Sequence, residues 1–365
     1  MAHPTFDDAR RLTDWQPPLG VVSVYLAFDP ADRGGAWRTE LRNGLDALLE
    51  AAKDADHERR VALRAVAKRI TERFEDGDHR PPPRGAAGFV EVAEKGGEEH
   101  WWGTGAAPQA SACVELGERP TLAPLVDLAC RGEQRGIAIV SLEQVRLLLF
   151  AEGELSEIAH WELEVTSLDW RERKVRSGGG DPSGGRGGPS GKDEYGERLD
   201  HNRHKFLGEA GGLVGRALEE RGIGRALAFG PAVDLESFEA GLNAPKVKLT
   251  AAGQEDLIST PTGQLRETVA AAVENADSDR EARLVAATME EVRGGGRGAA
   301  GLGDVSEAVE EGRVERLVLD AAGLGNGAEA LVRGALKVSA KITVVHNAAA
   351  ASLAEAEGVA AILRY

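Results

Sequence analysis

The segment GLGDVSEAVEEGRVERLVLD, residues 301–320, sets the fold class of the last third of the chain. Its first half spaces apolar residues as an amphipathic helix does, and its second half, Val314 to Asp320, is a short apolar run typical of a buried strand. The pattern then repeats, with a helix predicted over 328–338, a strand over 341–346, a further helix, and a last strand over 359–363. This alternation predicts a small α/β sandwich.

The middle of the chain shows the same alternation of strand and helix patterns. Strands are predicted at residues 136–141, 145–150, 158–165 and 226–229, and helices at 195–221 and 262–292. A mixed α/β domain is therefore expected here as well.

The first part of the chain has a β-α-α-β pattern. Strands are predicted over 21–28 and 86–93, and two amphipathic helices over 37–52 and 58–74, before a run of prolines at 81–83. The sequence thus predicts an α/β protein of three domains. These are an N-terminal α/β domain (1–133), a central mixed α/β domain (134–272) with a glycine-rich loop (177–191), and a C-terminal α/β sandwich (273–365).

Composition excludes several classes of protein. The 365 residues carry a formal net charge of −16, which argues against a broad basic surface for nucleic acid. Two cysteines exclude a disulfide scaffold and a four-thiolate zinc site. No apolar run approaches the length that spans a bilayer, and no secretory signal opens the chain, so we expect a cytoplasmic protein without a membrane partner.

The least ordinary segment is SGGGDPSGGRGGPSG, Ser177 to Gly191, in which eight of fifteen residues are glycine. Composition alone favours a flexible linker. The surroundings favour a functional loop, because residues 171–205 contain nine basic and six acidic side chains, a modest basic island in an acidic protein.

Three motifs resemble the archaeo-eukaryotic class-1 peptide chain release factors, the Pelota-type ribosome-rescue factors and their bacterial relatives. They are the loop GRGGPS (185–190), similar to the family's GRGGQS; the residues RHKFL (203–207), similar to the family's basic helix RHNYV; and residues 299–319 with the closing GVAAILRY (358–365). The resemblance extends over nearly the whole chain and is most specific in the C-terminal part.

The resemblance implies a fold, a role and a site. It implies an RNase H-like central domain, a C-terminal domain like the kink-turn-binding ribosomal proteins, and a factor that engages the ribosome and tRNA, with a translational GTPase as a further candidate partner. In the family the loop enters the peptidyl-transferase centre to hydrolyse peptidyl-tRNA, and glycines suit a narrow channel because they lack Cβ atoms. Residues matching the catalytic loop are Gly187, Gly188 and Pro189; those expected to contact RNA are Arg186, Ser190, Arg203, His204 and Lys205.

Two departures bear on activity. Pro189 stands where the family has glutamine, which removes both a side-chain amide and a backbone N–H that would orient water or stabilise an oxyanion. No match to the family's stop-codon motifs NIKS or YxCxxxF occurs in the first domain. Two hypotheses follow: a peptidyl-tRNA hydrolase without codon specificity, or a non-catalytic ribosome- or RNA-binding adaptor.

Other candidate sites are weaker. His201 and His204 have a helical spacing that permits a shared metal, but no thiolate or carboxylate pattern completes a site, so no metal is expected. Trp101 and Trp102 suit base stacking, although packing in an edge strand is the simpler interpretation. Residues 323–328, GLGNGA, fit a dinucleotide fingerprint and support a third hypothesis, a nucleotide enzyme; without an acidic residue after the next strand, no cofactor is expected.

Overall fold

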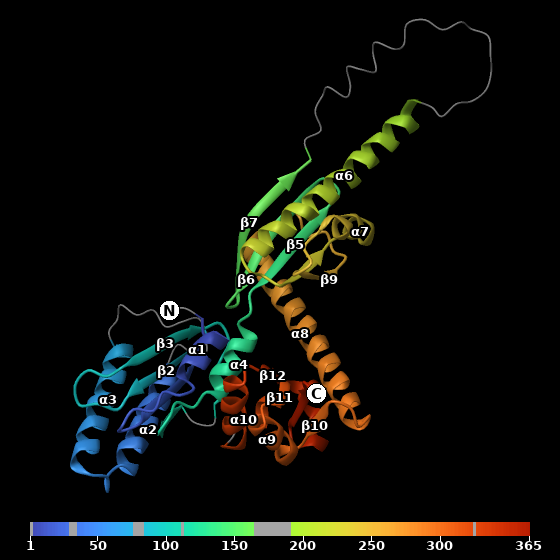
Figure 1. Ribbon diagram of the computed structural model, residues 1–365. Coiled ribbons are helices and arrows are strands. Elements are labelled where there is room, and N and C mark those ends of the chain that lie inside the picture. Colours follow the sequence, from blue (N-terminus) through green and yellow to red (C-terminus); the bar gives the residue numbers. More distant parts are fainter. Residues whose placement is uncertain (1–2, 29–34, 76–83, 111–112, 164–190, 324–325) are drawn as a thin grey trace, which may run out of the picture. The chain divides into compact units, whose positions relative to one another are not determined.

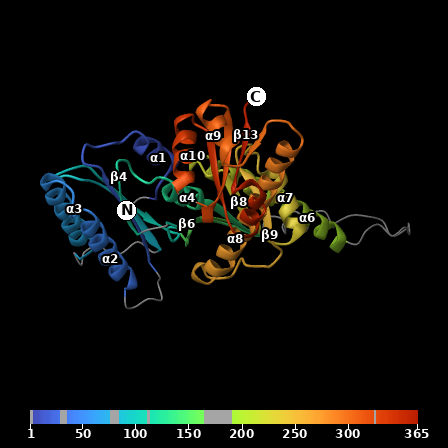
Figure 2. The ribbon, with the colours of Figure 1, turned by 90° about the horizontal axis from the view of Figure 1, so that it is seen from below.

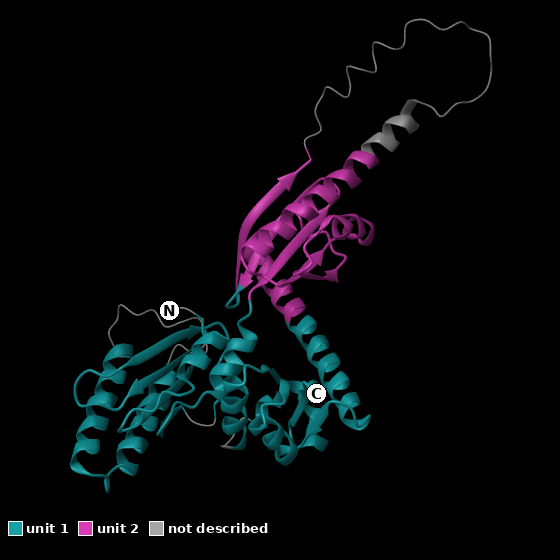
Figure 3. Cartoon of the chain, in the orientation of Figure 1, with its two compact units in different colours: residues 1–133, 151–153, 274–365 teal, residues 134–150, 154–273 magenta. Residues whose placement is uncertain are grey.

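Three β-sheets with helices packed against them form the framework of the protein (Figure 1). The computed structural model describes residues 3–28, 35–75, 84–110, 113–163, 191–323 and 326–365. These form two compact units (Figure 3): unit 1 comprises residues 1–133, 151–153 and 274–365, and unit 2 comprises residues 134–150 and 154–273. The predicted mixed α/β class is confirmed, and the three domain boundaries stay a prediction.

The N-terminal sheet of unit 1 is antiparallel, in the order β3-β2-β1-β4. Its strands are β1 (Val21–Ala27), β2 (Gly85–Glu91), β3 (Glu99–Thr104) and β4 (Val114–Gly117). Both faces are covered: Val22, Val24 and Leu26 of β1 pack in one apolar cluster, while Val21 and Tyr25 pack in another. This double burial explains why β1 is a continuous apolar run instead of an alternating one.

Helices α2 (Ala36–Ala51) and α3 (His57–Glu75) cover one face of this sheet. The apolar side chains predicted at helical spacing are buried there, among them Leu41 and Leu45 of α2 and Leu63 and Ile70 of α3. The spacing of these leucines therefore predicted the correct buried faces.

The C-terminal sheet of unit 1 has the order β10-β13-β11-β12. Its strands are β10 (Gly298–Ala300), β11 (Val314–Asp320), β12 (Lys341–Val345) and β13 (Val359–Leu363), and its helices are α9 (Leu302–Glu310), α10 (Asn326–Lys337) and α11 (Asn347–Ala351). Strands β11 and β12 are parallel and joined through α10, whereas β13 is antiparallel to β11. The predicted α/β alternation is present.

The two sheets of unit 1 share one apolar core. Helices α1 (Phe6–Leu12) and α4 (Ala123–Arg131) lie beside α10 in both views (Figures 1 and 2). Leu125 and Leu128 of α4 and Leu331 and Val332 of α10 belong to the same buried cluster. Apolar burial on this scale is the main term that stabilises the contact.

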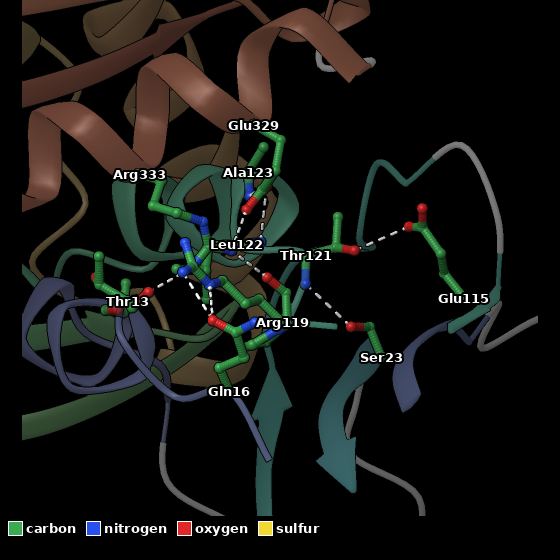
Figure 4. A network of polar contacts seen from close by, with 12 residues as sticks. Thr13, Gln16, Ser23, Glu115, Arg119, Thr121, Leu122, Ala123, Glu329 and Arg333 are labelled. Carbon is green, nitrogen blue, oxygen red and sulfur yellow. Dashed lines mark hydrogen bonds and ion pairs between the residues drawn. The ribbon is translucent and has the colours of Figure 1, made fainter. Parts of the chain in front are cut away.

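A polar network reinforces this contact at the start of α4 (Figure 4). The backbone N–H groups of Leu122 and Ala123 both donate to one carboxylate oxygen of Glu329 on α10, each at 2.8 Å. Arg333, one turn further along α10, donates to the other Glu329 oxygen and to the carbonyl oxygens of Thr13 and Pro120. The first N–H groups of α4 are thus capped by a side chain distant in sequence, because Leu122 has no polar side chain.

Unit 2 contains a five-stranded sheet in the order β7-β6-β5-β8-β9. Its strands are β5 (Arg135–Ser141), β6 (Gln144–Ala151), β7 (Glu154–Glu162), β8 (Arg225–Phe229) and β9 (Lys248–Gly253). Strands β5 and β6 are antiparallel, and β8 and β9 extend the sheet in parallel. The sheet of unit 2 is therefore mixed, as predicted for this part of the chain, and the RNase H-like topology stays a prediction. Helices α6 (Gly191–Glu220) and α7 (Ala232–Gly241) pack with this sheet in one buried cluster, and α8 (Thr262–Arg293) comes next along the chain.

Some elements were not predicted from the sequence: α1, α4, α7, β4, β9 and β10. Strand β7 begins at Glu154, four residues before the predicted start at 158. The edge-strand interpretation of Trp101 and Trp102 is confirmed, since β3 lies at the sheet edge and Trp102 is buried opposite Ala87. Gly88 leaves room for Trp101, because a Cβ there would lie 2.1 Å from the indole ring.

Among the described residues, no helix has the length and apolar character needed to cross a membrane.

Candidate RNA-contact helix

Helix α6 carries the part of the predicted site that the structure describes. Arg203, His204 and Lys205 lie on this 30-residue helix, which begins at Gly191. The loop residues Arg186, Gly187, Gly188, Pro189 and Ser190, and with them segment 177–190, lie outside the described residues. The geometry of the candidate site is therefore that of α6 and its neighbours in unit 2.

A row of glycines holds α6 close to α7. A Cβ at Gly211 would lie 2.1 Å from the carbonyl oxygen of Phe238, and one at Gly215 would lie 2.1 Å from that of Leu242. Gly241 of α7 approaches the backbone of Gly208 equally closely. The two helices contact one another through backbone, an approach that only glycine permits. This contact fixes the position of the turn that carries Arg203 to Lys205.

Arg203 is held by carboxylates. Its Nη2 and Nε donate to Glu143 Oε1 at 2.5 and 3.2 Å, and its Nη1 donates to Asp200 at 3.3 Å. The hydrogen bond that Arg203 donates to Glu143 is the main reason that the pKa of Arg203 is raised. Glu143 lies in the turn between β5 and β6, so this ion pair ties α6 to the sheet. A phosphate that approaches Arg203 therefore competes with the carboxylates of Glu143 and Asp200.

His204 and Lys205 have different surroundings. The Nδ1 of His204 forms a hydrogen bond of 2.9 Å with the hydroxyl of Ser237 on α7. The ammonium of Lys205 lies 3.8 Å from Glu209, and both side chains are 67% exposed. An exposed pair of this kind is weak. Of the three predicted RNA contacts, Lys205 is therefore the cation most accessible to a phosphate, while Arg203 and His204 attach α6 to its neighbours.

Glu143 and Ser237 were missed by sequence reasoning. They lie 60 and 33 residues from their partners Arg203 and His204, and neither stands in a motif. Only the tertiary structure brings them to α6. His201 is exposed, and no cluster of His, Cys, Asp or Glu able to hold a metal occurs among the described residues.

The fingerprint at 323–328 falls at the start of α10, where residues 324–325 lie outside the described part of the chain. The next strand, β12, is followed by His346, and this side chain is engaged elsewhere: its Nε2 is 3.0 Å from Asp127 on α4. The carboxylates that lie at the end of that strand, those of Asp127 and Glu281, both contact His346.

His346 belongs to a buried ionic cluster in unit 1. Asp127 is fully buried and accepts hydrogen bonds from His346 and Arg131. Glu281 of α8 accepts from the backbone N–H of His346 at 2.9 Å, and its other oxygen is 3.6 Å from Nδ1. Burial lowers the pKa of His346, but hydrogen bonds and charges of Asp127 and Glu281 outweigh it and raise the value to about 9. The cluster joins α4, α8 and the end of β12.

Comparison with known proteins assigns a family resemblance to the middle part of the chain. Residues 120–293, which contain α4, the sheet of unit 2 and helices α6 to α8, match the model of bacterial archaeo-eukaryotic release factor family 10. The resemblance to the release factor and Pelota superfamily that the motifs predicted is thus confirmed for this part of the chain. No functionally curated protein sequence matches the chain.

Several solved structures are similar over much of the chain. The crystal structure of the archaeal translation termination factor aRF1 shares 19% identity, covering 99% of this chain and 98% of its own, with a TM-score of 0.27. Archaeal Pelota, in a model of ribosome-bound Pelota and ABCE1, shares 14% identity, covering 100% and 95%, with a TM-score of 0.44. S. cerevisiae Dom34, a translation termination-like factor, shares 12% identity, covering 77% and 79%, with a TM-score of 0.42. The family model is the comparison that carries the assignment.

Proposed function

We propose that this protein is a release-factor-like protein that engages the ribosome and acts on peptidyl-tRNA without recognising stop codons. The observation that carries the proposal is the family-model match over 120–293, which includes the glycine-rich segment and α6. In this role the loop around Gly187 and Gly188 is directed toward the ester of the peptidyl-tRNA, and α6 supports the loop from its C-terminal side. A translational GTPase is a candidate partner in the same role.

The chemistry required of the loop is modest. Ester hydrolysis needs a water molecule placed against the carbonyl and donors for the oxyanion that forms. Pro189 provides neither a side-chain amide nor an N–H, so these donors have to come from neighbouring backbone groups or from the ribosome. If no donor is supplied, the same binding mode gives the second candidate function, an adaptor that occupies the tRNA site without cleaving the ester.

The experiment that separates the two functions measures release of labelled peptide from ribosome-bound peptidyl-tRNA. We expect the full chain to release peptide and the variant lacking residues 177–190 to release none, because the deletion removes the reactive loop. The variant Pro189→Gln restores the family residue and serves as the matched comparison. Activity in the Pro189→Gln variant alone supports the adaptor; unchanged release after the deletion excludes the loop from the reaction.

A second prediction concerns α6. The substitution Lys205→Ala is expected to weaken co-sedimentation with ribosomes several-fold, because a freely accessible phosphate contact is lost. Arg203→Ala is expected to lower the stability of unit 2 by about 1 kcal/mol, because it removes the ion pair with Glu143. The measurements are sedimentation at two salt concentrations and thermal unfolding of both variants.

Lys248→Ala is the control for Lys205→Ala, since Lys248 is also an exposed lysine of unit 2 but lies at the start of β9 and not on α6. If Lys205→Ala and Lys248→Ala weakened co-sedimentation with ribosomes equally, the total positive charge of the protein, and not α6, would govern binding. A Glu143→Gln variant that binds ribosomes more tightly than the wild type would further support a phosphate contact by the released Arg203.

A further inference from the structure

A hollow of about 290 Å³ lies in unit 1 between helices α2 and α3, which run side by side (Figures 1 and 2). Its floor is apolar and includes Trp37, Leu45 and Leu49 of α2 and Phe74 of α3. Leu49 and Phe74 are only partly buried, whereas Trp37 and Leu45 are nearly inaccessible. The hollow follows two helices of four to five turns, and α2 alone is about 24 Å long at 1.5 Å per residue.

The rims of this hollow carry positive charge. Arg38 and Arg42 of α2 lie on one side and Arg64 and Lys68 of α3 on the other, with Asp46 as the single carboxylate of the lining. Within the part of the chain that the structure describes, neither Arg42 nor Arg64 has a carboxylate within 4 Å. Lys68 pairs with Glu72 at 3.5 Å. With Asp46 and Glu72 set against the four cations, the surroundings of the hollow still carry a net positive charge in a chain whose net charge is −16.

The aromatic side chains of the hollow are not arranged for bases. The ring of Phe74 meets Trp37 and Trp101 edge-on, at centroid distances of 5.7 and 5.4 Å. The guanidinium of Arg38 covers the ring of Trp37 at 4.5 Å. Stacking requires an open ring face, and Arg38 already covers a face of Trp37. A single-stranded RNA therefore finds cations here but no stacking platform.

From these observations we infer that the hollow between α2 and α3 is a docking groove for an acidic amphipathic helix of a partner protein. The apolar floor suits leucine-type side chains at i, i+3 or i+4, and i+7, as in other complexes where a helix enters a groove. Glutamates on both flanks of such a helix reach Arg42 and Arg64 on opposite rims. The attraction between the acidic helix and the basic rims favours acidic partners over basic ones and speeds the association of the two proteins. Burial of the partner's leucines against the floor stabilises the complex.

The test uses the full chain and a fluorescent synthetic peptide of 18 residues, with leucines on one face and glutamates on both flanks of that face. A matched peptide replaces every glutamate by lysine. We expect the acidic peptide to bind at least tenfold more tightly than the basic one. The double variant Arg42→Glu/Arg64→Glu should lose at least tenfold in affinity for the acidic peptide and gain affinity for the basic peptide.

Two further variants keep the result interpretable. The variant Lys53→Glu/Lys95→Glu also replaces two basic side chains by glutamate, but at exposed positions of unit 1 outside the groove. Its affinity for the acidic peptide should stay within twofold of that of the wild type. Leu49→Glu places a charge on the floor and should abolish binding of the acidic peptide. Circular dichroism confirms that each variant is folded.

Three results would overturn the inference. They are equal binding of the acidic and basic peptides by the wild type, an equal loss in the Lys53→Glu/Lys95→Glu control, and a loss of oligouridine binding in Arg42→Glu/Arg64→Glu without any change in peptide binding. The last result would assign the rims to RNA. None of these results affects the loop or α6, so the proposed function is tested separately.

Discussion

Replacing Asp127 by asparagine is expected to lower the free energy of unfolding of unit 1 by about 3–5 kcal/mol. The carboxylate is fully buried and lies between the cations His346 and Arg131. Asparagine has nearly the same size but no charge, so it leaves two partly buried cations with less compensation. Removing one partner of a buried ion pair is costly for this reason, even where the intact pair adds little.

The measurement is urea unfolding followed by tryptophan fluorescence. Four of the six tryptophans, Trp15, Trp37, Trp101 and Trp102, lie in unit 1, so the signal reports mainly on this unit. The control is Asp14→Asn, because Asp14 pairs with Lys337 at the surface and is 78% exposed. An exposed pair of this kind contributes little to stability, so we expect a much smaller loss for Asp14→Asn than for Asp127→Asn. If Asp127→Asn and Asp14→Asn lowered the free energy of unfolding equally, burial of Asp127 would have no energetic consequence.

The same cluster predicts a pH dependence. The pKa of His346 is about 9 in the folded chain, above the value of 6.5 expected when unfolded. A raised pKa means that protonation stabilises the fold: the contribution is complete below pH 6.5 and is lost as the pH rises through 9. In Asp127→Asn the main partner is gone, so the fall in stability between pH 7 and 10 should be smaller than in the wild type. An unchanged slope would contradict this account of the cluster.

Replacing Glu329 by alanine is expected to lower the free energy of unfolding of unit 1 by about 3 kcal/mol, measured by the same urea unfolding. The carboxylate accepts the first two N–H groups at the start of α4 and pairs with Arg333 (Figure 4). Its pKa is raised by burial, so the carboxylate loses solvation and depends on these donors. Alanine leaves the donors of Leu122 and Ala123 unsatisfied.

The variant Glu329→Gln distinguishes the cap from the ion pair. A glutamine oxygen still accepts from the N–H groups of Leu122 and Ala123, so we expect a loss of roughly half that of alanine. Glu310→Gln, at an exposed position of α9, is the matched control and should change the free energy of unfolding by less than about 0.5 kcal/mol. Glutamine as damaging as alanine would assign the whole effect to Arg333.

The regular core elements were predictable because local pattern and tertiary environment agree. Strands β11 and β13 occur at the predicted residues, 314–320 and 359–363, since each is a short apolar run between turn residues. The helices α2 and α3 were predictable within two residues from the spacing of their leucines and other apolar residues. Strand β4 was not, because it is a four-residue edge strand with a weak signal.

Helix α4 shows why some elements escape sequence reasoning. Its N-terminal N–H groups are capped by Glu329, more than 200 residues away, so no capping residue marks its start. An aspartate at position 127 within the apolar run APLVDLAC was the available signal, since a buried acid requires a partner. Its partner His346 is known only from the tertiary structure. The candidate site shows the same limit of sequence reasoning. A motif identified Arg203, His204 and Lys205, but their partners Glu143 and Ser237 are known only from the tertiary structure.

The most direct test of the central claim is electron cryomicroscopy of the tagged full chain purified from a lysate of cells that express it. We expect ribosomal particles in which the protein occupies a tRNA site, with α6 beside the tRNA and the segment 177–190 directed toward the peptidyl-transferase centre. Particles without ribosomes, or ribosomes with this segment directed to solvent, would contradict the proposed function.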